Sequence, residues 1–120
     1  MRLRWLLLAL LLASVVAAAN FYANAHALYW RYTWIDVPIH YLGGLFLAVM
    51  AVALFDKRRP FFLIAVVVAI AVGWEIFEVF VGVPRENQSY ILDTSIDILM
   101  DALGAITAYI LARFTVWRSV

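Results

Sequence analysis

The stretch that decides the fold begins with Trp74-Glu-Ile-Phe-Glu78 and continues, after a short polar loop, with Asp93-Thr-Ser-Ile-Asp97-Ile-Leu-Met-Asp101-Ala-Leu-Gly104. Its two halves are otherwise apolar enough to span a bilayer, yet they carry five carboxylates: Glu75, Glu78, Asp93, Asp97 and Asp101. A carboxylate at membrane depth is costly unless it is paired, protonated or bound to a cation. We therefore expect these acids to mark the functional site.

The composition places the whole chain in a membrane. Of its 120 residues 68% are hydrophobic and 14% are charged, whereas soluble domains have about a quarter charged residues. We predict a single membrane domain over residues 1–120. The net charge of +1 says nothing about partners, but the lack of a basic stripe indicates no nucleic-acid partner. Because the chain has no cysteine, disulfides and thiolate chemistry are excluded.

Hydropathy predicts an all-α polytopic bundle of four transmembrane helices. Each segment is close to the roughly 20 residues that cross a bilayer, and the expected spans are residues 5–24, 36–55, 61–81 and 93–113. Asp36 and Asp93 stand at the expected starts of the second and fourth spans, where either could act as a plain N-cap. Pro38 is tolerated in the first turn of its helix.

The first span could also be the start of a secretory signal peptide, cleaved after residues 17–19 or 23–25. The helical pattern does not stop at those sites, so we expect a retained span. Small and polar residues recur on one face of it, which favours close helix packing: Ala9, Ala13, Ala17, Asn20 and Asn24. Residues 25–34 are rich in aromatics and are typical of a membrane-interface belt.

The basic residues predict the orientation. With four spans, one side of the membrane receives Arg2, Arg4, Lys57, Arg58, Arg59, Arg113 and Arg118, and the other receives Arg31 and Arg85. The positive-inside rule then places both termini in the cytoplasm. We expect a multi-pass membrane protein.

Polar residues of all four spans fall at similar depths. Counting 1.5 Å per residue from the cytoplasmic ends gives one layer with Asn20, His40, Glu75 and Asp97 and a second, further out, with Asn24, Asp36, Glu78 and Asp93. Asp101 lies about one turn deeper than Asp97. The acids of each helix also share a face that continues into small residues. We therefore expect one polar pocket in the outer half of the bilayer.

Two physical solutions suit several carboxylates beside one histidine. Some acids can remain protonated, as in a proton relay, or a divalent cation can neutralise them. For the cation we expect His40, Glu75 and Asp97 as ligands, with Asp36 and Asp93 as further candidates. Glu78 or Asp101 is the expected general base. A purely structural network with Asn20, Asn24, Tyr41, Thr94 or Ser95 is the third interpretation, and the metal's identity stays open.

The motifs also resemble a known family. Asp36-x-x-x-His40-Tyr-Leu-Gly-Gly, Trp74-Glu-Ile-Phe-Glu78 and Asp93-Thr-x-x-Asp97-x-Leu-Met-x-x-Leu-Gly104-Ala are similar to the YjdF-like family of small bacterial inner-membrane proteins. More distantly they resemble the VanZ-like family, named for a protein associated with glycopeptide resistance. Asp101 departs from both, since the VanZ-like pattern favours Asn there and the YjdF-like pattern a small residue. The resemblance implies a polytopic fold in a bacterial envelope and no particular reaction.

The leading hypothesis is a divalent-cation site that acts on the polar head of a membrane lipid or lipid-linked envelope precursor, by hydrolysis or phosphoryl transfer. Whether the protein is an enzyme stays open. The alternative is a proton- or cation-coupled transport or channel component, which with four spans predicts a homo-oligomer. A structural accessory subunit is the remaining alternative, in which Gly43, Gly44 and Gly104 would matter more than the acids.

Overall fold

The computed structural model describes residues 2–55, 58–81 and 90–118, so Lys57, Arg85 and most of the predicted loop at 82–92 lie outside the described part. The elements are α1 (Leu3–Ala25), α2 (Leu28–Arg31), η1 (Thr33–Ile35), α3 (Asp36–Leu54), α4 (Pro60–Val81) and α5 (Tyr90–Phe114). No strand occurs among these residues. Four of the helices are long and apolar enough to cross a membrane, which confirms the predicted all-α fold with four spans.

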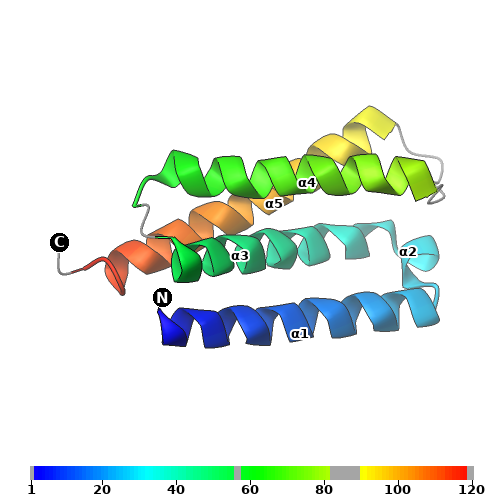
Figure 1. Ribbon diagram of the computed structural model, residues 1–120. Helices are drawn as coiled ribbons and strands as arrows, with labels where there is room; N and C mark the ends of the chain where they lie inside the picture. The colour runs from blue at the N-terminus through cyan, green and yellow to red at the C-terminus, as the bar shows by residue number, and fades with distance from the viewer. Residues whose placement is uncertain (1, 56–57, 82–89, 119–120) are drawn as a thin grey trace.

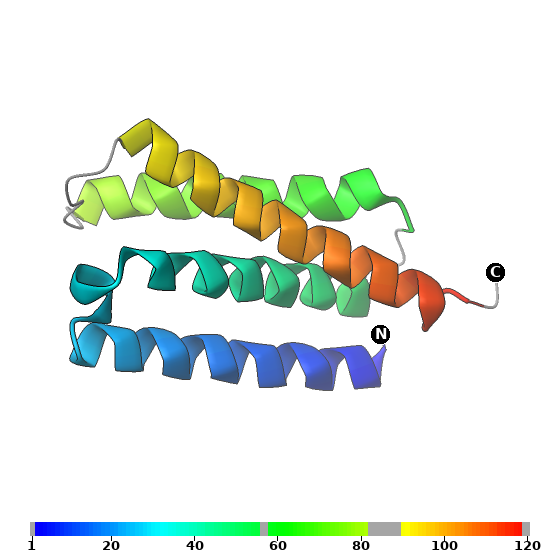
Figure 2. The ribbon, with the colours of Figure 1, turned by 180° about the vertical axis from the view of Figure 1, so that it is seen from behind.

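Helix α3 occupies the middle of the bundle. It packs against α1 on one side and against α5 and α4 on the other, and α5 crosses the bundle diagonally (Figures 1 and 2). Both chain ends lie at the same end of the bundle, and the short helix α2 lies at the opposite end (Figure 1). The acids of α3 and α5 therefore meet along the most extensive helix–helix contact of the protein.

Both predicted N-caps are wrong. Asp36 lies in the first turn of α3, with Ile35 at the N-cap position and no side-chain capping hydrogen bond. Helix α5 begins at Tyr90, three residues earlier than predicted, so Asp93 also lies within the first turn. An acid in the first turn is stabilised by the positive end of the helix dipole. The two carboxylates therefore belong to helical faces, where they can meet other helices.

The backbones of α3 and α5 touch where two glycines cross. A Cβ atom added at Gly44 would clash with the backbone oxygen of Asp101 and would lie 2.5 Å from its Cα. A Cβ atom at Gly104 would clash with the backbone of Tyr41 and Leu45. Beyond the glycines the contact continues through the fully buried Ala48, Ala105, Ala108 and Ala112. Small residues allow this close approach, as in other membrane helix pairs.

Helix α1 packs mainly against α3. Its buried residues are Trp5, Ala9 and Ala23. Only Ala9 of the predicted small-residue face is therefore buried, and the face that contacts α3 differs from the predicted one. At the other end of α3, the Arg2 guanidinium donates hydrogen bonds to the carbonyls of Val52 at 2.9 Å and Phe55 at 3.3 Å. A basic side chain at helix C-terminal carbonyls is a stabilising arrangement.

We predict that Gly44→Ala and Gly104→Ala each destabilise the bundle by at least about 1–3 kcal/mol, the usual cost of overpacking a core. The cost follows because the added methyl group meets backbone atoms, which cannot rotate away. The measurement is denaturant unfolding of the detergent-solubilised protein, followed by circular dichroism.

Gly73→Ala is the matched control, because a Cβ atom at Gly73 in α4 has nothing within 4 Å. Alanine is the better helix former by about 1 kcal/mol, so this variant should be as stable as the wild type or more so. Equal stability of all three variants would contradict the close crossing.

Candidate functional site: an acidic pocket around His40

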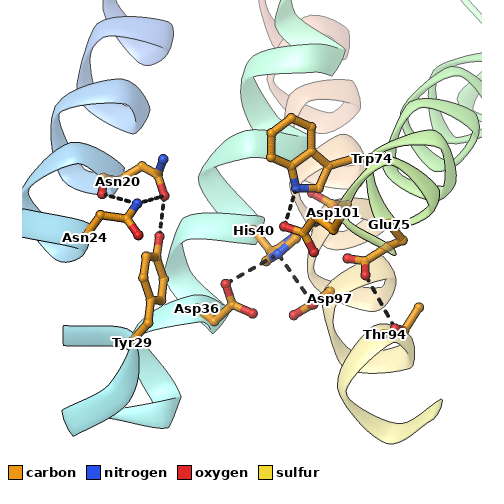
Figure 3. A network of polar contacts seen from close by, with 11 residues as sticks. Asn20, Asn24, Tyr29, Asp36, His40, Trp74, Glu75, Thr94, Asp97 and Asp101 are labelled. Carbon is orange, nitrogen blue, oxygen red and sulfur yellow. Dashed lines mark hydrogen bonds and ion pairs between the residues drawn. The ribbon is translucent and has the colours of Figure 1, made fainter. Parts of the chain in front are cut away.

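His40 lies at the centre of a group of three aspartates (Figure 3). Its Nε2 atom is 3.5 Å from Asp36 Oδ1, one turn earlier on α3, and 3.5 Å from Asp97 Oδ2 on α5. Its Nδ1 atom is 3.2 Å from Oδ2 of Asp101, one turn further along α5. The two ring nitrogens thus face different carboxylates. We call these four residues the acid–histidine pocket.

The four side chains differ in exposure, and Asp36 is the most exposed of them. The side chains of Asp97 and Asp101 are only 5% and 8% exposed, and that of His40 is 15% exposed. The Asp36 side chain is 32% exposed. A ligand from outside the bundle would therefore reach Asp36 first. The buried aspartates also require compensation, because an unpaired buried charge is strongly destabilising.

Three of these residues lie close enough together that they could hold one metal ion. One ligand atom each from Asp36, His40 and Asp97 lies within 4.8 Å of the other two. The 3.5 Å separations from Nε2 exceed the usual 2.7–3.2 Å of a direct N–H···O hydrogen bond. Tetrahedral ligands at about 2.0–2.1 Å from a metal are about 3.4 Å apart. The spacing is therefore compatible with one cation among the three side chains.

Asp101 can fix the tautomer of His40. When the Nδ1–H group donates to Asp101 Oδ2, the lone pair of Nε2 points toward Asp36 and Asp97. A histidine that ligates a metal commonly donates its other ring N–H to a carboxylate, which orients the ring and raises its basicity. Asp101 can thus orient the His40 ring relative to Asp36 and Asp97.

The remaining predicted site residues lie outside this group of three. Glu75 of α4 is buried, and its Oε2 atom accepts a hydrogen bond of 3.4 Å from Thr94 Oγ1 of α5 (Figure 3). Glu78 accepts a hydrogen bond of 2.8 Å from the Trp74 indole nitrogen. Asp93 is half-buried, one turn before Asp97 on α5. The structure thus brings Asp36, His40, Asp97 and Asp101 together and places the other three acids around them.

Two predicted network members have other partners. Asn20 of α1 accepts hydrogen bonds from the Tyr29 hydroxyl at 2.6 Å and from the Asn24 amide at 3.3 Å (Figure 3). Tyr41 forms a 2.7 Å hydrogen bond with Thr107 of α5. The amides of α1 therefore form a separate polar cluster with α2, and Tyr41 strengthens the α3–α5 contact.

Tyr29 is the residue that the sequence analysis missed. Burial, together with the negative charges of Asp36 and Glu78, raises its pKa to about 12. Tyr29 thus hydrogen-bonds to the α1 amides and feels the charge of the acids. The sequence places it in an aromatic belt, and its position depends on Ala27, whose φ of 54° turns the chain after α1. Glycine or asparagine usually marks such a left-handed turn, so alanine gives no signal there.

We predict that Tyr29 stays protonated when ordinary tyrosines ionise. At pH 11 a tyrosine of pKa about 10 is about 90% ionised, whereas Tyr29, with a pKa of about 12, stays largely neutral. The tyrosinate absorbance at pH 11 should therefore be nearly equal in wild type and Tyr29→Phe. Tyr22→Phe removes another tyrosine of the same region as a comparison. A loss of signal in Tyr29→Phe with a midpoint near pH 10 would contradict the placement of Tyr29.

The family comparison agrees with this fold. The family model described as "Predicted membrane protein (DUF2238)" matches residues 2–118. This match is consistent with the YjdF-like resemblance, while a VanZ-like relationship stays a prediction. No match is found among the curated proteins or among the solved structures. Because the match covers nearly the whole chain, the protein belongs to the family of predicted membrane proteins described as DUF2238.

Proposed function

We propose that the acid–histidine pocket binds a divalent cation and acts on the polar head of a membrane lipid or lipid-linked envelope substrate. The observation that carries the proposal is the convergence of Asp36, His40 and Asp97, whose ligand atoms lie within 4.8 Å of one another. Nitrogen and carboxylate ligands together suit Zn²⁺, Mn²⁺ or Fe²⁺. Glu75 and Asp93 remain candidate ligands from the surrounding acids.

The negative charge of the group is compatible with a divalent cation. Asp36, Asp97 and Asp101 carry three negative charges when all are ionised, and all three contact His40. A protonated His40 offsets one of these charges. A divalent cation bound by a neutral His40 offsets two of these negative charges. In a low-dielectric interior such compensation is favourable, because an unpaired buried charge is strongly destabilising.

The proposed orientation puts this pocket in the outer half of a bacterial inner membrane. Both chain ends lie at the end of the bundle opposite to α2 (Figure 1). That end carries Arg2, Arg4, Arg58, Arg59, Arg113 and Arg118, which the positive-inside rule assigns to the cytoplasm. Asp36 at the start of α3 then faces the outer leaflet, where envelope precursors have their polar heads.

Each residue has a distinct role in this proposal. Asp36, His40 and Asp97 hold the ion, and Asp101 orients His40 through Nδ1. Glu78, held by the Trp74 indole, is the candidate general base that accepts a proton from water. A divalent ion bound here would supply Lewis-acid polarisation of a phosphoryl or carbonyl oxygen and would make water more acidic. The exposed side of Asp36 is where the substrate head would enter.

The transport alternative lacks such support in the described residues. Beyond the acids, the α3–α5 contact is closed by the two crossing glycines and then by fully buried alanines. Tyr41 and Thr107 hydrogen-bond to each other there rather than continuing a polar path. A route for protons or cations would therefore have to lie away from the α3–α5 contact.

The first test is metal content of the purified protein by elemental analysis. After exposure to Zn²⁺, Mn²⁺ or Mg²⁺ and removal of excess metal, we expect about one ion per chain in the wild type and loss of it in Asp97→Asn and His40→Gln. Glu78→Gln is the matched control, because Glu78 lies outside the group of three, so it should keep the ion. An ion-free wild type would overturn the proposal.

A second prediction separates Asp101 from the ligands. Asp101→Asn should bind the ion about 10–100-fold more weakly than wild type, the usual effect of losing a partner that orients a metal-bound histidine. Titration with a competing chelator measures this affinity. Unchanged affinity, or complete loss as in Asp97→Asn, would show that Asp101 does not act through His40.

A further inference from the structure

An apolar pocket lies between α1 and α3, next to α2. Its volume is about 270 Å³, and seven of its eight lining residues are aliphatic or proline, the eighth being Tyr22. Ala19 and Ala23 form part of its α1 wall, and Ile39 and Leu42 part of its α3 wall. None of these residues belongs to the acid–histidine pocket.

The chemistry of the walls selects a hydrocarbon. Both helices are candidate membrane spans, and their backbone groups are hydrogen-bonded within the helices, so the walls offer little to a polar ligand. Apolar cavities of about 150 Å³ stay dry and take up apolar molecules. In a bilayer the hydrocarbon in contact with such a pocket is the chain of a lipid.

The surroundings of the pocket favour a lipid chain. Its lining lies mainly within residues 19–23 of α1 and 38–42 of α3, and both helices are candidate membrane spans. Lipid chains surround every such span in a bilayer, so a chain reaches this pocket without a partner protein. A helix of a second copy at this face is the alternative outcome of the test.

The pocket and the acids share two turns of α3. Ile35 and Ile39 line the apolar pocket, and their sequence neighbours Asp36 and His40 belong to the acid–histidine pocket. Tyr29, which is near enough to Asp36 to be affected by its charge, hydrogen-bonds to Asn20, the neighbour of the lining residue Ala19. An amphipathic molecule could thus place its chain between α1 and α3 and its polar head at Asp36.

We propose that the α1–α3 pocket holds one hydrocarbon chain of a membrane lipid whose polar head is presented to Asp36 and His40. The identity of this lipid as the substrate rests on the proposed function, whereas binding of the chain does not. The pocket is thus a chain-binding subsite, and it selects substrates that carry a hydrocarbon chain next to a polar head.

The test is photolabelling of the full chain in vesicles of phosphatidylethanolamine and phosphatidylglycerol. A trace of phosphatidylethanolamine carries a diazirine within one acyl chain, and mass spectrometry locates the label. We expect label to concentrate on residues 19–23 and 35–42. Ala19→Phe, which fills the pocket, should lower this labelling about tenfold, equivalent to about 1.4 kcal/mol of chain binding. Ala17→Phe is the matched control on the same helix, because Ala17 is exposed and does not line the pocket.

Label spread evenly over all lipid-facing helices, or equal labelling of the two alanine variants, would overturn the proposal. So would a change of oligomeric state in Ala19→Phe without loss of label, which would indicate a second copy at this face. If Ala19→Phe does not fold, Leu42→Phe fills the pocket from α3, and the wild-type label map stands by itself. Comparing the label map with the metal content of the wild type and of Asp97→Asn separates the two proposals. Concentrated label in a protein that binds no metal in either form would refute the cation site alone.

Discussion

The contact of Gly44 with Gly104 is the constraint on which the rest of the structure depends. It lets the backbones of α3 and α5 touch, and the touching atoms on α5 include the backbone of Asp101 itself. His40 lies one turn before Gly44, and Asp97 lies about two turns before Gly104. The crossing therefore determines which acids of α5 meet the histidine. Gly43 has a lesser role, because a Cβ atom there would be 3.8 Å from Asp101 Oδ1, an ordinary contact.

The close crossing places buried charge where water cannot screen it. Asp97 and Asp101 are nearly inaccessible, and each lies within 3.5 Å of a ring nitrogen of His40. Replacing such a cluster by apolar residues is often neutral or stabilising for a fold, so stability alone does not explain its presence. The glycines and alanines of the α3–α5 contact already provide the packing. The presence of the acids therefore needs a separate, functional explanation. The proposed cation site would account for the two aspartates at Nε2 and for Asp101 at Nδ1.

Much of the fold could be predicted from hydropathy. The predicted spans 36–55 and 61–81 agree with α3 and α4 to within one residue at each end. The contact face of α1 could not be predicted, because its alanines occur on several faces and only the position of α3 decides which are buried. The start of α5 was placed too late, since Asp93 looks like a cap although the helix has already begun.

The site was predictable in part. Spacing along α3 and α5 indicated that Asp36, His40 and Asp97 lie at neighbouring depths, and the structure brings them together. Depth alone could not show that Asn20 hydrogen-bonds to Tyr29 or that Tyr41 hydrogen-bonds to Thr107. The first pair depends on the turn at Ala27, and the second depends on the crossing angle of α5. Depth also could not show that Asp101 contacts Nδ1 of His40 whereas Asp97 contacts Nε2.

The central claim is that His40 Nε2 and two aspartates share one cation. X-ray absorption spectroscopy of the protein loaded with one equivalent of Zn²⁺ tests it most directly, because an imidazole ligand gives a characteristic outer-shell signal. The account predicts the signal of one imidazole in wild type, its loss in His40→Gln and its retention in His26→Gln, which changes the exposed histidine that packs against Tyr22. A wild-type spectrum without imidazole, or an imidazole signal that survives in His40→Gln, would contradict it.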